Sequence, residues 1–184
     1  MEAKKLIQLS KRLILAIDSG TSSSRVCLID RHLSILDIEN LSHSQITINQ
    51  GWTEHNPDEI YNNITGLISK LKTRNKILFD NISGISITNQ RETTVCWNKK
   101  SGKPYCNAIV WHDNRNDSIV QEMIKKYGSP DFLRKRCGLP MNTYFSAGKI
   151  KWIIDNIEEV GKKIKNKDIS DLCFGTIDSW LIYV

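Results

Sequence analysis

The stretch Leu13-Ile-Leu-Ala-Ile-Asp-Ser-Gly-Thr-Ser-Ser-Ser-Arg-Val-Cys-Leu-Ile-Asp30 decides the fold of this chain. Two apolar runs, rich in the residue types that favour strands, flank a polar turn around Gly20. This pattern predicts a β-hairpin whose tip runs from Asp18 to Arg25. The tip combines a carboxylate, a glycine, several hydroxyl side chains and an arginine.

The composition of this tip suits the binding of phosphate. Gly20 lets the backbone approach a ligand closely and can adopt a positive φ, and successive N–H groups can form a concave site for an anion. Asp18 would hold Mg²⁺ or its water shell. The stretch is not a P-loop, because it lacks the Gly-Lys-Ser/Thr ending and leads into a strand. An ordinary Ser/Thr-rich turn is the alternative.

Length and composition are those of a soluble globular protein. The chain has 184 residues, 40% hydrophobic and 25% charged, which is an ordinary balance for a globular domain. No apolar run approaches the ~18 residues that a membrane-spanning helix needs. Residues 1–12 are basic and lack the apolar centre of a secretory signal. We therefore expect an N-terminal extension over 1–12 and no membrane span.

The five cysteines predict a reducing compartment, the cytoplasm. Their number is odd and no Cys-x-x-Cys pair occurs, so neither a disulfide framework nor a zinc site is indicated. His112-Asp113 could be a fragment of a metal site, but a histidine at the surface or at the edge of the core is the simpler interpretation.

The net charge of +6 raises the possibility of a nucleic-acid partner. However, the lysines are scattered, and the densest cluster, Lys162–Lys167, is typical of a solvated helix end or loop. The excess charge could equally attract an anionic nucleotide. We therefore expect no nucleic-acid partner.

Hydrophobic periodicity places the remaining elements. A third strand is predicted over 34–40, and a helix begins at Pro57, with an apolar face at helical spacing. Strands are predicted over 82–88, 95–97, 108–111 and 172–174, and helices over 117–127, 130–136, 146–157 and 175–183. This order of elements indicates an α/β fold with a mixed sheet.

Arg91-Glu92 comes directly after the apolar strand 82–88. Ligands of open α/β sheets bind beyond the carboxyl ends of strands. A carboxylate can accept hydrogen bonds from two adjacent hydroxyls, and a guanidinium donates through a rigid fork, so the pair suits a small polyol. The alternative is a surface ion pair, usually worth only ~0–1 kcal/mol.

Two aromatic residues could complete such a polyol site. Trp111 ends the strand 108–111, where its indole could shield a small site from water, and Tyr144 could offer its hydroxyl to a ligand. The alternatives are a tryptophan at the edge of the core and a hydrophobic staple at the start of a helix.

Several motifs resemble one known family in order and spacing. Residues 15–25 resemble the first phosphate motif of the carbohydrate kinases in the actin, hexokinase and Hsp70 superfamily. The further matching motifs resemble glycerol kinases of the FGGY family: Gly51-Trp-Thr-Glu-His-Asn-Pro57, Ile87-Thr-Asn-Gln-Arg-Glu-Thr-Thr94, Asn107-Ala-Ile-Val-Trp111, Thr143-Tyr-Phe-Ser146 and Phe174-Gly-Thr-Ile-Asp-Ser-Trp-Leu181. The Asn-Gln-Arg-Glu-Thr-Thr segment is the most specific, since relatives that act on pentuloses or gluconate typically differ there.

The resemblance implies a fold, a reaction and a set of roles. The fold would be ribonuclease-H-like. The reaction would be ATP- and Mg²⁺-dependent phosphorylation of glycerol to sn-glycerol 3-phosphate, with ATP and glycerol as the ligands. Arg91, Glu92 and Tyr144 would hold the glycerol hydroxyls, and Trp111 would lie against the carbon face of glycerol. The residues that would contact the nucleotide phosphates and the ADP are Thr21, Ser22, Ser23 and Arg25, with Asp18 supporting the metal.

The resemblance also implies that the sequence holds only part of the family's usual chain. Residues 13–184 would be the N-terminal kinase domain, truncated at its C-terminal end, with the second domain absent. The family's catalytic aspartate, which takes the proton from the attacking hydroxyl, would lie beyond Val184. The chain alone is then expected to be an inactive fragment. Alternatives are a non-catalytic remnant or binding module, or another FGGY polyol or sugar kinase. Full-length members of the family are often homo-oligomers.

Overall fold

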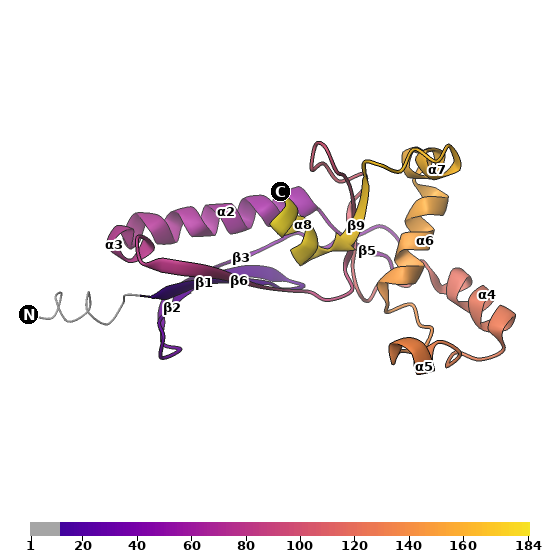
Figure 1. Ribbon diagram of the computed structural model, residues 1–184, viewed down its shortest axis with the longest axis horizontal. Helices are drawn as coiled ribbons and strands as arrows, with labels where there is room; N and C mark the ends of the chain where they lie inside the picture. Colours follow the sequence, from indigo (N-terminus) through magenta and orange to yellow (C-terminus); the bar gives the residue numbers. More distant parts are fainter. Residues whose placement is uncertain (1–11) are drawn as a thin grey trace, which may run out of the picture. The chain divides into compact units, whose positions relative to one another are not determined.

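The computed structural model describes residues 12–184 (Figure 1). It divides into two compact units, which are described separately. The first contains the described residues up to Ser44 together with Asp58–Asn89. The second contains Gln45–Pro57 and Gln90–Val184. Most of the expected extension over 1–12 lies outside the described residues.

The first unit is built on a four-stranded mixed sheet. Its strands are β1 (Leu13–Ser19), β2 (Ser23–Ile29), β3 (Ile35–Ser42) and β6 (Ile82–Asn89), in the order β3-β2-β1-β6. The β1–β2 and β2–β3 pairs are antiparallel, whereas β1–β6 is parallel. The predicted hairpin, third strand and mixed sheet are therefore confirmed.

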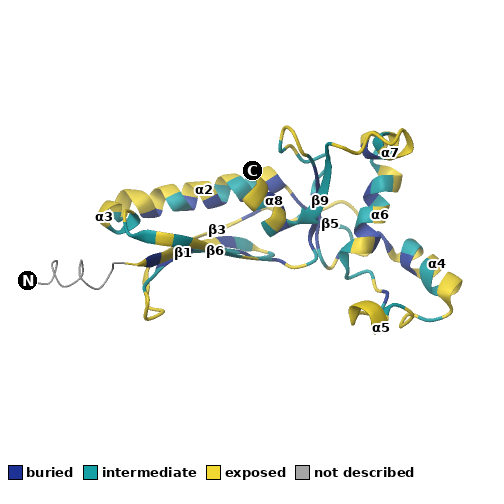
Figure 2. Ribbon diagram, in the orientation of Figure 1, coloured by how far each residue is buried: buried dark blue, intermediate teal, exposed yellow. Residues whose placement is uncertain are grey.

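Helix α2 (Pro57–Arg74) lies along this sheet (Figure 1). Acidic residues in its first turn and basic residues in its last turn complement the helix dipole. Of the five residues of the predicted apolar face, Ile60, Ile64, Leu67 and Leu71 are buried and Ile68 is partly buried. On β1 buried residues alternate with more exposed ones, the pattern of a sheet with one covered face (Figure 2). The short helix α3 (Lys76–Phe79) follows α2.

Strand β6 is less buried than its apolar sequence suggests. It is an edge strand of the sheet within residues 12–184, and Ile85 is 68% exposed. The burial of a strand depends on which elements pack against it as well as on its own apolar residues. The periodicity of β6 does not reveal those packing elements.

The second unit has a sheet of its own, with β4 (Ile46–Thr47), β5 (Thr53–His55), β8 (Ala108–Ile109), β7 (Thr94–Asn98) and β9 (Leu172–Thr176) in the order β4-β5-β8-β7-β9. The order of elements predicted one sheet, continued by the strands over 95–97 and 108–111. That prediction is wrong, because these strands belong to the second sheet. The reason is the turn after β6, beyond which β7 pairs with β8 and β9 instead.

The helices of the second unit are α4 (Asp117–Tyr127), α5 (Arg134–Cys137), α6 (Ser146–Asn156), α7 (Glu158–Lys165) and α8 (Ile177–Tyr183). The helix expected over 130–136 is reduced to α5, which has no buried residue to hold a longer helix in place. Helix α7 was not predicted as a separate element. Its lysines lie in the last turn, where cations are favourable, so Lys162–Lys165 is indeed a helix end.

All five cysteines are free thiols in the structure. Cys96 is fully buried in a core cluster with Ile109, Ile153 and Val160. Burial raises the pKa of Cys96 to about 12 and that of Cys106 to about 11. Both are therefore protonated at neutral pH and act as small apolar core residues.

Candidate functional site

The hairpin tip in the first unit is the candidate phosphate site. The strand register pairs Asp18 with Arg25 and Ser19 with Ser24. The turn is closed by a 3.0 Å hydrogen bond from the amide of Gly20 to the carbonyl of Ser23. Thr21 and Ser22 occupy the bend between the two strands. The tip thus exposes backbone and hydroxyl groups at one end of the sheet.

Glycine suits position 20 because the backbone of Ser23 lies close to it, and not because the position has a positive φ. Gly20 is not among the glycines with a positive φ, so the tip does not use the positive φ that glycine would allow. A Cβ at position 20 would lie 3.3 Å from the carbonyl oxygen of Ser23, tighter than an ordinary van der Waals contact. The turn folds back on itself too tightly for a side chain to be added comfortably.

His43 supports this tip from just beyond β3, and sequence reasoning missed it. Its ring Nε2 lies 2.8 Å from the carbonyl oxygen of Thr21, and its backbone amide donates to the carbonyl of Ser22 at 3.2 Å. Because a carbonyl only accepts, Nε2 carries the proton. Burial lowers the pKa of His43 below its usual value, although Thr21 and Glu59 oppose the shift. The ring is therefore neutral at pH 7.

His43 gives the chain an acid-sensitive element, which is a testable prediction. Below pH ~6.5 the unfolded chain takes up a proton that the folded chain resists, so stability should fall as pH falls. NMR titration of the ring should give a midpoint below ~6.5. In urea denaturation at pH 7 and pH 5, His43→Gln should lose less stability on acidification than the wild type, because the donor is kept and the titration removed. Equal losses would contradict the assignment.

Asp18 and Arg25 face each other across the hairpin. Their side chains are about half exposed and form an ion pair of 3.4 Å. Such a pair contributes little to stability, so an anionic ligand can compete for the guanidinium at small cost. The carboxylate of Asp18 is suited to a magnesium ion that keeps most of its water shell. Within residues 12–184 no three His, Cys, Asp or Glu side chains are grouped to enclose a metal ion.

The second candidate site lies in the second unit, at the turn between Gln90 and Thr93. The amide of Thr93 donates to the carbonyl of Gln90 at 3.2 Å, and Arg91 is exposed. Glu92 has a positive φ of 67°, unusual for a residue with a Cβ. Such a conformation costs on the order of 1–3 kcal/mol, and strained residues of this kind cluster at functional sites.

The carboxylate of Glu92 is tied to the start of α6. Its Oε2 accepts hydrogen bonds from the amide of Ser146 at 3.1 Å and from the hydroxyl of Ser146 at 2.9 Å. A carboxylate is stabilised at a helix N-terminus by the helix dipole. Among the described residues none donates to Oε1, which is left available to a ligand hydroxyl.

Trp111 is hydrogen-bonded to this turn and contacts Tyr144. The hydroxyl oxygen of Thr93 accepts a 3.1 Å hydrogen bond from the amide of Trp111. The ring centroids of Trp111 and Tyr144 are 5.5 Å apart, a geometry typical of favourable aromatic pairs. Trp111 itself lies in a turn just after β8, not within the predicted strand. Three residues far apart in the sequence, Glu92, Trp111 and Tyr144, are thus connected locally.

Asp113, which together with His112 could have been a fragment of a metal site, belongs to a buried charge network close to Trp111. Asp113 is 1% exposed, and Oδ2 accepts from the amide of Thr53 at 2.6 Å and from the guanidinium of Arg115 at 2.8 Å. Arg115 also pairs with Glu54 at 2.7 Å, and its guanidinium lies over the rings of both Trp52 and Trp152. His112 is exposed. The role of Asp113 is therefore structural.

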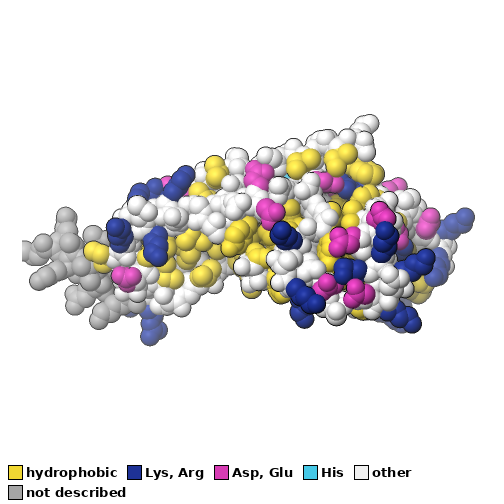
Figure 3. All heavy atoms as spheres, turned by 90° about the horizontal axis from the view of Figure 1, so that it is seen from above, with side chains coloured by type: hydrophobic (Ala, Val, Ile, Leu, Met, Phe, Trp, Pro, Cys, Tyr) yellow, Lys and Arg dark blue, Asp and Glu magenta, His cyan; other side chains and the backbone are white. Residues whose placement is uncertain are grey.

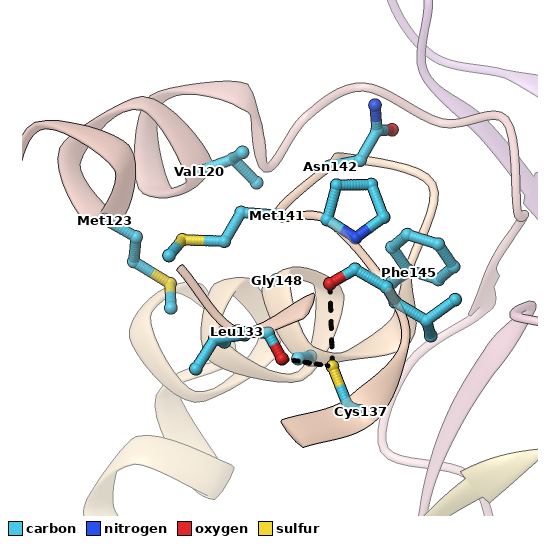
Figure 4. A pocket seen from close by; sticks show the side chains of 11 residues that line it. Val120, Met123, Leu133, Cys137, Met141, Asn142, Phe145 and Gly148 are labelled. Atoms are coloured by element: carbon cyan, nitrogen blue, oxygen red, sulfur yellow. Dashed lines mark hydrogen bonds between the residues drawn. The ribbon is translucent and has the colours of Figure 1, made fainter. Parts of the chain in front are cut away.

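An apolar pocket of about 160 Å³ lies between α4, α5 and the start of α6 (Figure 4). Its wall includes Val120, Met123, Leu133, Met141 and Phe145. The thiol of Cys137 at its edge donates to two backbone carbonyls. The lining contains no charged side chain, so the pocket does not suit glycerol or a phosphate.

On the face drawn in Figure 3, basic side chains are interspersed with acidic ones and do not form one continuous basic field. Within residues 12–184, no helix has both the length and the apolar character needed to cross a membrane.

The mixed sheet with flanking helices is the architecture of a carbohydrate-kinase type of domain. Residues 13–184 match the N-terminal domain of the FGGY family of carbohydrate kinases. The chain belongs to this family, and its fold is the ribonuclease-H-like, actin-like fold of these kinases.

Its relatives in this family include glycerol kinases. The chain is 40% identical over 172 residues to the glycerol kinase of Clostridium botulinum and 42% identical over 172 residues to that of Borrelia garinii. These alignments cover 94% of this chain and 34% of the relatives, so the chain corresponds to their N-terminal third.

Solved structures give the same result. The structure of Plasmodium falciparum glycerol kinase with ADP matches at a TM-score of 0.80 and 39% identity, covering 94% of this chain and 34% of that one. The xylulose kinase of Rhodospirillum rubrum has a TM-score of 0.81 at 18% identity over 93% of this chain and 33% of that one, which supports the fold alone.

Proposed function

We propose that this chain carries the phosphate-binding and polyol-binding parts of a glycerol kinase, an enzyme that converts glycerol and ATP into sn-glycerol 3-phosphate and ADP. The observation that carries the proposal is the clustering of Glu92, Trp111 and Tyr144. An acceptor at Glu92 Oε1 and a phenol lie in one region with an indole, which is the combination that a small polyol requires. Arg91, exposed in the same turn, supplies a donor fork.

The hairpin tip is the proposed nucleotide side. Thr21, Ser22 and Ser23 would donate to the phosphates of the nucleotide, and Arg25 would contact the ADP. Asp18 would hold magnesium through water. The bound magnesium nucleotide supplies the transferable phosphoryl group and neutralises its charge. The protein groups in both sites position the reactants, which is the main work of the protein in such transfers.

The catalytic base is proposed to lie outside these 184 residues, because no aspartate here stands in the family's matching context. The chain should therefore bind its ligands without turning them over. The five free thiols support a reducing compartment, the cytoplasm, as the place where this kinase portion works. A kinase acting on a related sugar is the second candidate, because kinases of different substrates share this fold and the fold alone does not fix the substrate.

Ligand titration tests the proposal and separates these candidates. Glycerol, D-xylulose and D-gluconate are added in turn to the chain, and binding is followed by calorimetry and by tryptophan fluorescence. We expect saturable binding of glycerol alone among the three, and saturable binding of magnesium–ADP that is weakened about tenfold or more by Arg25→Ala. Preference for D-xylulose or D-gluconate would overturn the glycerol assignment. Ordinary turnover in a coupled ADP-release assay would overturn the expectation about the base.

A further inference from the structure

Lys149 is a fully buried lysine in the first turn of α6. A cation is disfavoured there, because the N-terminal end of a helix carries partial positive charge. No carboxylate forms an ion pair with Lys149 within the described part of the chain. Asp113 and Glu92 are the charged groups that interact with it electrostatically, and burial lowers its pKa to about 8. For packing alone, an apolar side chain of the same length would cost less.

The ammonium group of Lys149 holds the backbone that carries Tyr144. Its Nζ donates to the carbonyl of Thr143 at 2.7 Å and to that of Tyr144 at 2.8 Å. The side-chain amide of Asn116 donates to the same Thr143 carbonyl at 3.2 Å. Two successive carbonyls are therefore fixed, and with them the direction in which the Tyr144 side chain leaves the backbone.

The packing around this contact leaves little room for adjustment. Gly148 lies against Asn116, and a Cβ at position 148 would be 2.3 Å from the side-chain nitrogen of Asn116. On the other side of Tyr144, the side chain of Asn142 accepts a hydrogen bond from the Tyr144 amide at 2.9 Å. The segment that carries Tyr144 is thus held at both of its backbone polar groups.

We propose that Lys149 is a positioning residue for the polyol site, because its ammonium holds the Thr143 and Tyr144 carbonyls and so keeps the Tyr144 ring against Trp111. This inference rests on the proposed function for its link to glycerol, but the position of the ring can be measured without any ligand. Ser146, three residues earlier in the same helix, binds Glu92. The first turn of α6 therefore orients two polyol-contacting residues at once.

The test compares Lys149→Met with Lys151→Met, the same substitution on the same helix. Lys151 is exposed and pairs with Asp155, so its variant is the matched control. Two readouts are recorded on labelled protein by NMR. The first is the set of nuclear Overhauser effects between the Trp111 and Tyr144 rings, together with the order parameters of residues 142–146. The second is the glycerol affinity, taken from shift changes during titration. Thermal unfolding is measured alongside.

For Lys149→Met we expect loss of the Trp111–Tyr144 contacts, lower order parameters over 142–146 and glycerol binding about tenfold weaker or worse, with the melting temperature kept or raised. Lys151→Met should match the wild type. If Lys149→Met fails to fold, Lys149→Gln provides the test: it retains one donor and should give intermediate contacts and affinity. Unchanged ring contacts in the folded variant would overturn the inference. Lost ring contacts in a chain whose wild type binds no glycerol would uphold the positioning role and refute the proposed substrate.

Discussion

Replacing Glu92 by alanine is expected to weaken glycerol binding about 100-fold or more, while the affinity for magnesium–ADP stays the same. The carboxylate is the acceptor proposed for the glycerol hydroxyls, and a hydrogen bond to a charged group contributes roughly 1.5–3 kcal/mol. Nucleotide binding is assigned to the hairpin of the other unit, so it should not respond. Calorimetric titration with each ligand measures both effects.

Two companion variants separate binding from folding at this position. Glu92→Gly relieves the positive φ of 67°, so it should fold at least as well as Glu92→Ala and still lose glycerol. Glu122→Ala removes an exposed glutamate of α4 and should change neither affinity. Glycerol affinity within about threefold of the wild type in Glu92→Gly would show that Glu92 does not hold the substrate.

Replacing Arg115 by methionine is expected to destabilise the chain by about 3–5 kcal/mol, because it leaves Asp113 and Glu54 as uncompensated buried carboxylates. The guanidinium is nearly inaccessible, with the rings of Trp52 and Trp152 at 4.5 and 4.8 Å. Methionine keeps most of the side-chain volume, so the decrease in the free energy of unfolding measures mainly the effect of leaving the two carboxylates unpaired. The free energy of unfolding from urea titration measures it.

Arg134→Met is the matched control for this prediction. Arg134, the first residue of α5, pairs with the preceding Asp131 at 2.8 Å, but both side chains are more than half exposed. Its loss should cost no more than about 1 kcal/mol. Equal effects of the two substitutions would show that the Arg115 network does not hold Asp113 and β5 in place.

Local patterns predicted the first unit well. The apolar runs on both sides of Gly20 gave the β1–β2 hairpin, and the spacing of Ile60, Ile64, Leu67 and Leu71 gave the buried face of α2. Each depends on residues close in sequence. The exposed edge of β6 and the change of sheet after residue 90 depend on which strands become neighbours, and single-strand periodicity carries no such information.

In the candidate sites, too, features set by local sequence were predicted and features that depend on distant contacts were not. Glu92 was identified from its place after a strand, and the structure adds its positive φ and its bond to Ser146. The supporting roles of His43 and Lys149 were missed, because both act through backbone carbonyls of distant or irregular segments. One signal was present: a lysine in the first turn of an apolar helix face runs against the helix dipole. The assignment of ligand-contacting residues remains a prediction.

The most direct test of the account is a crystal structure of this chain with both glycerol and magnesium–ADP. The expected result is that the glycerol hydroxyls lie on Arg91 and Glu92 and that the ADP phosphates lie at the tip between Thr21 and Ser23. Glycerol bound away from Glu92, or ADP phosphates bound away from the tip, would contradict it.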